Sequence, residues 1–294
     1  MRRIKRNNRL GGLAIAVLTC LMSFADAMAQ KQFTLEDLNF GGKNYHNMTP
    51  ENRYATWWGE TLVRLDAENC STIDTKTGKE NVLFNLEEIN KWAETTEEAP
   101  VRSLYYAEFP YPGKPYVFVK SKKERILVDF KKHNTVWRQD CENASANDWN
   151  AKSKALAFVK DNQLYVTDGN GVTNKLTEDG SREIVYGQAV HRNEFGIMKG
   201  TFWSNNGEKL AFYRMDQSMV TDYPQVDVFP KIAAHEPDKY PMAGDMSHKV
   251  TVGVYDMKTG STVYLKAGDP TDRYFTNIAW SPDDKCIYMF ELNR

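Results

Sequence analysis

Hydrophobic and polar positions alternate along most of the chain, in short runs that are separated by turn residues. Three segments share one arrangement, in which a tryptophan is followed by a polar turn and then by a strand with alternating apolar positions. These segments are WNAKSKALAF, WSNNGEKLAF and WSPDDKCIYM, which begin at Trp149, Trp203 and Trp280. Recurrence at one repeat position indicates that the tryptophans pack in a core and do not stack on a ligand.

A second motif is an aspartate that opens a hairpin turn ending in glycine. It has the form Asp-x-x-Thr-Gly at Asp74 and Asp256, and a tighter form at Asp168. The glycine supplies the positive φ that such hairpins require. Successive aspartates are roughly 90 residues apart, about two units of the ~40–50 residues of a propeller blade. Two motifs interleaved in register favour a β-propeller over the alternative, a β-sandwich.

Helical signals are few. Thr34-Leu-Glu-Asp predicts a short capped turn, and residues 86–98 are either a short helix or an acidic loop. No long linker rich in proline or serine divides the chain. The predicted fold class is therefore all-β, with residues 51–294 forming the propeller.

The first 29 residues have the arrangement of a secretory signal peptide. The basic stretch MRRIKRNNR precedes the apolar run LGGLAIAVLTCLMSF, and small residues at Ala27 and Ala29 follow, so cleavage is expected after Ala29. The apolar run between Arg9 and Asp26 is short for a membrane span, which makes an anchor the weaker alternative. We therefore expect export to the periplasm, the cell surface or the medium.

Charge and residue chemistry exclude several functions. The formal net charge of −1 gives no overall attraction for nucleic acid, so no nucleic-acid partner is expected. Cys70, Cys141 and Cys286 follow the predicted signal peptide without C-x-x-C spacing, and Cys286 is expected to be buried in a strand. The sequence has no G-x-S-x-G elbow, no glycine-rich phosphate loop and no zinc-type histidine spacing. We therefore predict no catalytic residue, no metal site and no cofactor in this chain.

One segment does not fit a plain connection between strands. Residues 185–199, VYGQAVHRNEFGIMK, crowd His191, Arg192 and Glu194 together. A loop that only joins strands is usually short and needs no such cluster. The segment is either a binding surface or a solvated bend, and residue chemistry alone favours the bend.

Three stretches together resemble a known family. They are VYGQAVHRNEFGIMKGTFWS (185–204), LAFYRMDQSMVTDYP (210–224) and YPMAGDMSHKVTVGVYD (240–256). They are similar to the N-terminal propeller of the dipeptidyl peptidase IV family of serine exopeptidases, and within it to the bacterial prolyl tripeptidyl peptidases. The resemblance implies an eight-bladed propeller followed by an α/β-hydrolase domain that holds the catalytic Ser, Asp and His.

If the resemblance holds, the chain is an N-terminal fragment with about half of the propeller, and it is expected to be inactive by itself. Residues 30–50 are expected to pack on the C-terminal α/β-hydrolase domain of the same parent chain.

The resemblance also gives Glu194 a role. In this family an acidic residue at the matching position binds the free α-amino group of the substrate, and His191, Arg192 and Asn193 would support the loop. Relatives that release dipeptides carry two glutamates where this chain has Asn193-Glu194, which favours tripeptide release. A second family feature, an arginine that contacts a substrate carbonyl, has no aligned counterpart, and Arg138 is not a secure substitute.

Two functions follow as hypotheses. In the first, the chain is the substrate-gating propeller of an exported, proline-specific serine exopeptidase that acts on short peptides with a free N-terminus, with a homodimer left open. In the second, it is a non-catalytic secreted propeller that binds peptides or a protein, since one fold hosts many functions.

Overall fold

The structure is a computed structural model that describes residues 32–45 and 54–293. The predicted signal peptide, residues 1–29, lies outside these ranges. The chain divides into two units, residues 1–52 and 53–294. In the first unit, helix α2 (Leu35–Leu38) begins after Thr34. The Thr34 hydroxyl accepts a hydrogen bond from the Asp37 N–H, and the Asp37 carboxylate accepts one from the Thr34 N–H, which confirms the predicted capped turn.

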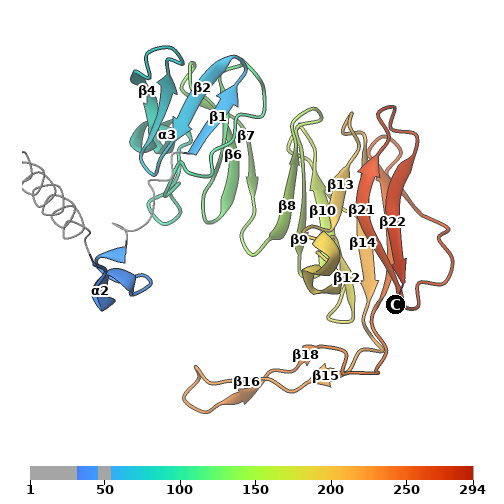
Figure 1. Cartoon of the computed structure of the whole chain (residues 1–294). Coiled ribbons are helices and arrows are strands. Elements are labelled where there is room, and N and C mark those ends of the chain that lie inside the picture. The colour runs from blue at the N-terminus through green and yellow to red at the C-terminus, as the bar shows by residue number, and fades with distance from the viewer. Residues whose placement is uncertain (1–31, 46–53, 294) are drawn as a thin grey trace, which may run out of the picture. The chain divides into compact units, whose positions relative to one another are not determined.

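The second unit consists of consecutive antiparallel sheets (Figure 1). The first contains, in order, β1 (Tyr54–Trp58), β2 (Thr61–Leu65), β3 (Asn69–Ile73) and β4 (Glu80–Asn85). The second contains β5 (Tyr116–Lys120), β6 (Glu124–Asp129) and β7 (Asn134–Asp140). The third contains β8 (Ser145–Asn150), β9 (Ala155–Lys160), β10 (Gln163–Thr167) and β11 (Thr173–Lys175).

The fourth sheet has an interrupted edge. It contains β12 (Ile184–Tyr186), β14 (Lys209–Asp216), β19 (Lys249–Asp256) and β20 (Ser261–Tyr264), and β13 (Thr201–Trp203) also pairs with β14. The last sheet described is the pair β21 (Arg273–Trp280) and β22 (Ile287–Asn293). Between β14 and β19, four two-residue strands pair as β15 (Asp222–Tyr223) with β18 (Asp238–Lys239) and β16 (Val226–Asp227) with β17 (Ala234–His235).

Sheets whose neighbouring strands follow one another in sequence are successive propeller blades, so the all-β prediction is confirmed. Helix α3 (Leu86–Trp92) connects the first two sheets. Its N-cap Asn85 and Glu88 form a reciprocal capping box, which decides in favour of a helix at the start of residues 86–98. No helix in the described ranges is both long and apolar enough to span a membrane.

The recurring tryptophans link one blade to the next. The Trp203 indole N–H donates to the carbonyl oxygen of Asp148 at 3.0 Å, and the Trp280 indole N–H donates to that of Phe202 at 2.9 Å. In both cases the acceptor belongs to the previous blade and is the residue immediately before that blade's repeat tryptophan, Trp149 or Trp203. The same side chains pack against the hydrophobic core of their sheets, as the repeat predicts.

The aspartate turns also recur once per blade. Carboxylate oxygens of Asp74, Asp168 and Asp256 each accept two backbone N–H groups from their own turn. Asp129 does the same in the second sheet, although its turn contains no glycine. In that turn His133 takes the left-handed conformation, with a φ of 60°. The repeat therefore occurs in four consecutive blades of the described chain.

The expectation for Cys286 was wrong. Its side chain is exposed, whereas Cys70 and Cys141 are buried. In β22 the half-buried positions are Ile287 and Met289, and Tyr288 between them is exposed. Side chains in a strand alternate between the two faces, so Cys286, two positions before the exposed Tyr288, lies on the same outward face.

Candidate functional site

Glu194 lies in a loop whose two ends, Gly187 and Gly200, both hydrogen-bond to the same residue of β14, Tyr213. The Gly187 N–H donates to the Tyr213 carbonyl oxygen at 2.9 Å, and the Tyr213 N–H donates to the Gly200 carbonyl oxygen, also at 2.9 Å. Residues 188–199 are therefore an insertion within one edge strand. At Gly200 a Cβ would lie 2.0 Å from the Gln188 carbonyl oxygen, so only glycine closes the base of this loop without a backbone shift.

The tip of the loop has an uncommon backbone. It forms the 3₁₀ segment η2 (His191–Gly196), in which Arg192, Asn193 and Phe195 have φ angles of 52°, 64° and 55°. Left-handed conformations cost roughly 1–2 kcal/mol for residues with a Cβ, and they persist where the surrounding structure fixes them. Glu194 alone at the tip is extended, with φ −64° and ψ 161°.

Aromatic packing fixes this conformation from beneath. The buried His191 ring lies 4.3 Å from that of His248 and 4.2 Å from that of Tyr274, measured between centroids. Phe195 meets Tyr274 edge-on at 5.0 Å. The His191 backbone N–H also donates to Nε2 of His248 at 3.1 Å. Burial lowers the pKa of His248 to about 4, so its ring is neutral at pH 7 and can accept this bond.

Arg192 is bound away from the neighbouring glutamate. Its guanidinium pairs with the Asp238 carboxylate at 3.2 Å and lies 4.7 Å above the centre of the Tyr240 ring. Both partners of the ion pair are half-exposed, so the pair orients Arg192 more than it stabilises the fold. No residue in the described ranges forms a hydrogen bond or an ion pair with the exposed Glu194 carboxylate.

Glu194 borders a small cavity of about 90 Å³. The cavity is lined by residues of the loop, of the segment before β19 and of β21, namely His191, Arg192, Glu194, Tyr240, Pro241, Ser247, His248 and Tyr274. A fixed carboxylate without a partner can bind an ammonium group through a charge-assisted hydrogen bond. Asn193 instead lines a separate cavity with Asp148 and Lys199. The four residues predicted for this loop therefore face two cavities.

Arg138, the arginine considered for a substrate carbonyl, is already bound by other groups of the protein. Arg138 donates to the Ala93 carbonyl oxygen and lies 3.6 Å from the Glu124 carboxylate. Arg125, which no sequence motif marked, donates to the carbonyl oxygens of Ser121 and Glu124 at 3.3 and 3.2 Å. His248 and Tyr274 were also missed, because only the fold brings them beneath the loop.

Known proteins with similar sequences are peptidases. The sequence profile of the dipeptidyl peptidase IV N-terminal region matches residues 115–294. The probable dipeptidyl-aminopeptidase B of Phaeosphaeria nodorum is 31% identical over 179 residues, which are 53% of this chain and 20% of the relative. That of Talaromyces stipitatus is 29% identical over 166 residues, covering 50% of this chain and 18% of the relative. The matched part is thus about a fifth of these curated relatives.

Solved structures agree. A protein from Bacteroides ovatus, assigned as a dipeptidyl aminopeptidase IV, has a TM-score of 0.75 and 41% identity, covering 90% of this chain and 36% of its own. Porphyromonas gingivalis dipeptidyl peptidase 4 has a TM-score of 0.66 at 18% identity and is alike in fold. It covers 90% of this chain and 39% of its own. The sequence profile, which spans more than half of the chain, together with these structures establishes that the chain belongs to the dipeptidyl peptidase IV family, in its N-terminal region.

Proposed function

We propose that the chain is the substrate-gating propeller portion of an exported, proline-specific serine exopeptidase, and that Glu194 binds the free α-amino group of the substrate. The observation that carries the proposal is the state of this carboxylate. It is exposed on a loop that packs on Tyr274 and has no partner among the described residues, while Arg192, two positions before it, is bound to Asp238.

The physical reason is selection by distance. A carboxylate at a fixed position holds the ammonium group of a peptide, so a bond a set number of residues away reaches the nucleophile. A peptide with a blocked amine offers no charge to Glu194, and covering the carboxylate without a partner costs free energy. Substrates with a free N-terminus are then preferred.

The rest of the reaction belongs to the proposed hydrolase domain of the parent chain. There a serine would attack the carbonyl after proline, with histidine as general base and aspartate orienting it. The names of the relatives favour dipeptide release, and Asn193-Glu194 in place of two glutamates favours tripeptide release. Product length, measured by mass spectrometry on defined proline peptides, distinguishes the two.

The test is Glu194→Gln in the complete parent enzyme. Loss of a charge-assisted hydrogen bond is expected to raise KM for unblocked peptides roughly 10- to 100-fold, with kcat little changed. Glu236→Gln, at another exposed glutamate of the same unit, is the matched control and should leave KM unchanged. N-acetylated peptides should be poor substrates for wild type and for the Glu194 variant alike. Equal KM values for unblocked peptides in wild type and Glu194→Gln would refute the assignment.

A further inference from the structure

The segment between β14 and β19, residues 217–248, forms an arm of two short strand pairs, and the base of this arm contacts the loop that carries Glu194. One side chain of the loop makes the contact. The Arg192 guanidinium pairs with the Asp238 carboxylate at 3.2 Å and lies 4.7 Å above the centre of the Tyr240 ring. A guanidinium can bind a carboxylate at its edge and an aromatic ring at its face at the same time. Both groups that hold Arg192 therefore belong to the arm.

Arg192 and Glu194 are separated by one residue, and both border the cavity of about 90 Å³. The Glu194 carboxylate is exposed and has no partner within residues 32–45 and 54–293. An arginine side chain is long and has many rotamers, so a guanidinium released from the arm can reach a carboxylate at the border of the same cavity. An ion pair between the two would occupy the group that the substrate ammonium needs.

The base of the arm fixes the position of Asp238 through the residues on both sides of it. The carbonyl oxygen of Pro237 accepts a hydrogen bond from Arg182 at 2.7 Å. Lys239, whose side chain is only 9% exposed, pairs with the Asp222 carboxylate at 3.3 Å. Arg182 also pairs with Asp222, at 2.7 Å. The carboxylate that binds Arg192 is therefore held in place by a network of charges at the arm base.

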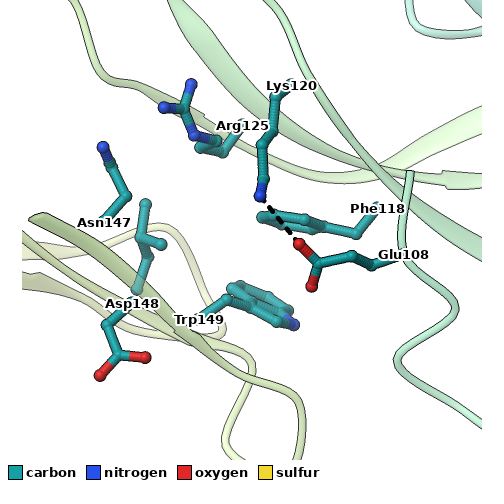
Figure 2. Close-up of a pocket in the computed structure, with 8 residues that line it drawn as sticks. Glu108, Phe118, Lys120, Arg125, Asn147, Asp148 and Trp149 are labelled. Atoms are coloured by element: carbon teal, nitrogen blue, oxygen red, sulfur yellow. Dashed lines mark hydrogen bonds and ion pairs between the residues drawn. The ribbon is translucent and has the colours of Figure 1, made fainter. Parts of the chain in front are cut away.

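An ion pair in another part of the chain has no such competitor. In the pocket between the second and third sheets, Lys120 pairs with Glu108 at 2.8 Å (Figure 2). The other carboxylate that lines this pocket, Asp148, points away from the pair and is already bound by a lysine at 3.1 Å. A released Lys120 would find no free carboxylate there, whereas a released Arg192 would find Glu194.

We propose that Asp238 is a positioning residue that, with Tyr240, keeps Arg192 off Glu194, so that the arm regulates the binding of the substrate amine. A shift of the arm base that breaks these two contacts lets Arg192 pair with Glu194, and the ammonium group is then excluded. Asp238 acts through Arg192 and not on the substrate. The inference rests on the proposed role of Glu194.

The test is Asp238→Asn in the complete parent enzyme, which removes the charge and keeps the size of the side chain. An exposed ion pair shifts a two-state balance by a small factor, so pairing of Arg192 with Glu194 is expected to raise KM for unblocked peptides roughly two- to sixfold. The value of kcat should change little, because the competition is with substrate binding.

Two double variants separate this role from a structural one. In a Glu194→Gln background there is no carboxylate for Arg192 to occupy, so adding Asp238→Asn should not raise KM further. In an Arg192→Gln background there is no guanidinium to be released, so Asp238→Asn should again have no further effect. If Asp238 only supported the fold of the arm, its substitution would raise KM by the same factor in all three backgrounds.

Asp179→Asn is the matched control, because it breaks a similar contact away from the loop. Asp179 pairs with Arg214 at 3.4 Å, and the Arg214 guanidinium lies 5.8 Å above the Tyr186 ring. This variant should leave KM unchanged.

The outcomes also separate the inference from the proposed function. If Glu194→Gln raises KM and Asp238→Asn does not, the role of the arm is refuted and the assignment of Glu194 stands. An equal effect of Asp238→Asn with and without Arg192 would likewise refute the role of the arm. If Glu194→Gln itself leaves KM unchanged, the proposed function fails.

Discussion

The backbone N–H of His191 donates a 3.1 Å hydrogen bond to Nε2 of His248, which lies 57 positions further along the chain. This bond joins the loop that carries Glu194 to the residue just before β19. Because the acceptor is a ring nitrogen, the bond exists only while His248 is neutral. The position of Glu194 is therefore coupled to one buried imidazole.

Stability should fall with pH below neutrality because of His248. Its folded pKa of about 4 lies below the ordinary value of 6.5, so the unfolded state takes up the proton first. The contribution is complete above about pH 6.5 and is lost as pH falls toward 4, at most about 3 kcal/mol. The ring of His191 packs against the His248 ring, with 4.3 Å between the centroids.

Denaturant unfolding at pH 7, 5.5 and 4.5 measures this slope. His248→Gln keeps an acceptor that does not titrate, so the slope between these values should flatten. His235→Gln, at an exposed histidine, is the control and should retain the wild-type slope. An unchanged slope in His248→Gln would assign the pH dependence to other groups.

Gly200→Ala should strain the base of the loop. The new Cβ would meet the Gln188 carbonyl oxygen at 2.0 Å, and because this is backbone, the chain must move. We expect a loss of about 1–3 kcal/mol of unfolding free energy, as for other overpacked sites.

Gly196→Ala is the matched control for Gly200→Ala. It has a φ of +75° but nothing within 4 Å of the added Cβ, so only the backbone strain of about 1 kcal/mol applies. Urea unfolding of both variants measures the difference. A Gly200→Ala protein as stable as wild type would mean that the loop base is not tightly closed.

The indole hydrogen bond between blades predicts which of two tryptophan substitutions destabilises the protein more. Trp203→Phe removes the hydrogen bond to the Asp148 carbonyl oxygen, whereas Trp149→Phe removes an indole N–H that has no acceptor among the described residues. The Trp203 variant should therefore be less stable than the Trp149 variant by about 1 kcal/mol. Thermal unfolding of the two proteins gives the comparison, and the reverse order would contradict the role of this bond.

Local patterns were sufficient to predict most of the fold. The Trp149, Trp203 and Trp280 strands and the glycine-ended turns recur in the structure because each blade repeats the same short-range chemistry. The turn at Asp129 was missed, since His133 takes the left-handed position without being glycine. Cys286 was placed inside because an apolar run does not reveal which face of a strand is outward.

The site could be located from the sequence but not explained. The crowded charges around Glu194 marked the loop, and the family resemblance suggested its role. The residues that fix the loop, His248 and Tyr274, come from distant strands and follow no local spacing.

The closure of the loop at Tyr213 has a consequence for how such proteins diverge. Tyr186 pairs with Arg214 and Thr201 pairs with Phe212, and between them Gly187 and Gly200 both hydrogen-bond to Tyr213. With residues 188–199 left out, the edge strand would therefore have the two-against-one pairing of a β-bulge. Residues can then be added to or removed from the loop while every strand keeps its partners. In lineages derived from such a chain, the reach of the loop can change through insertions and deletions alone, without compensating substitutions in the sheet.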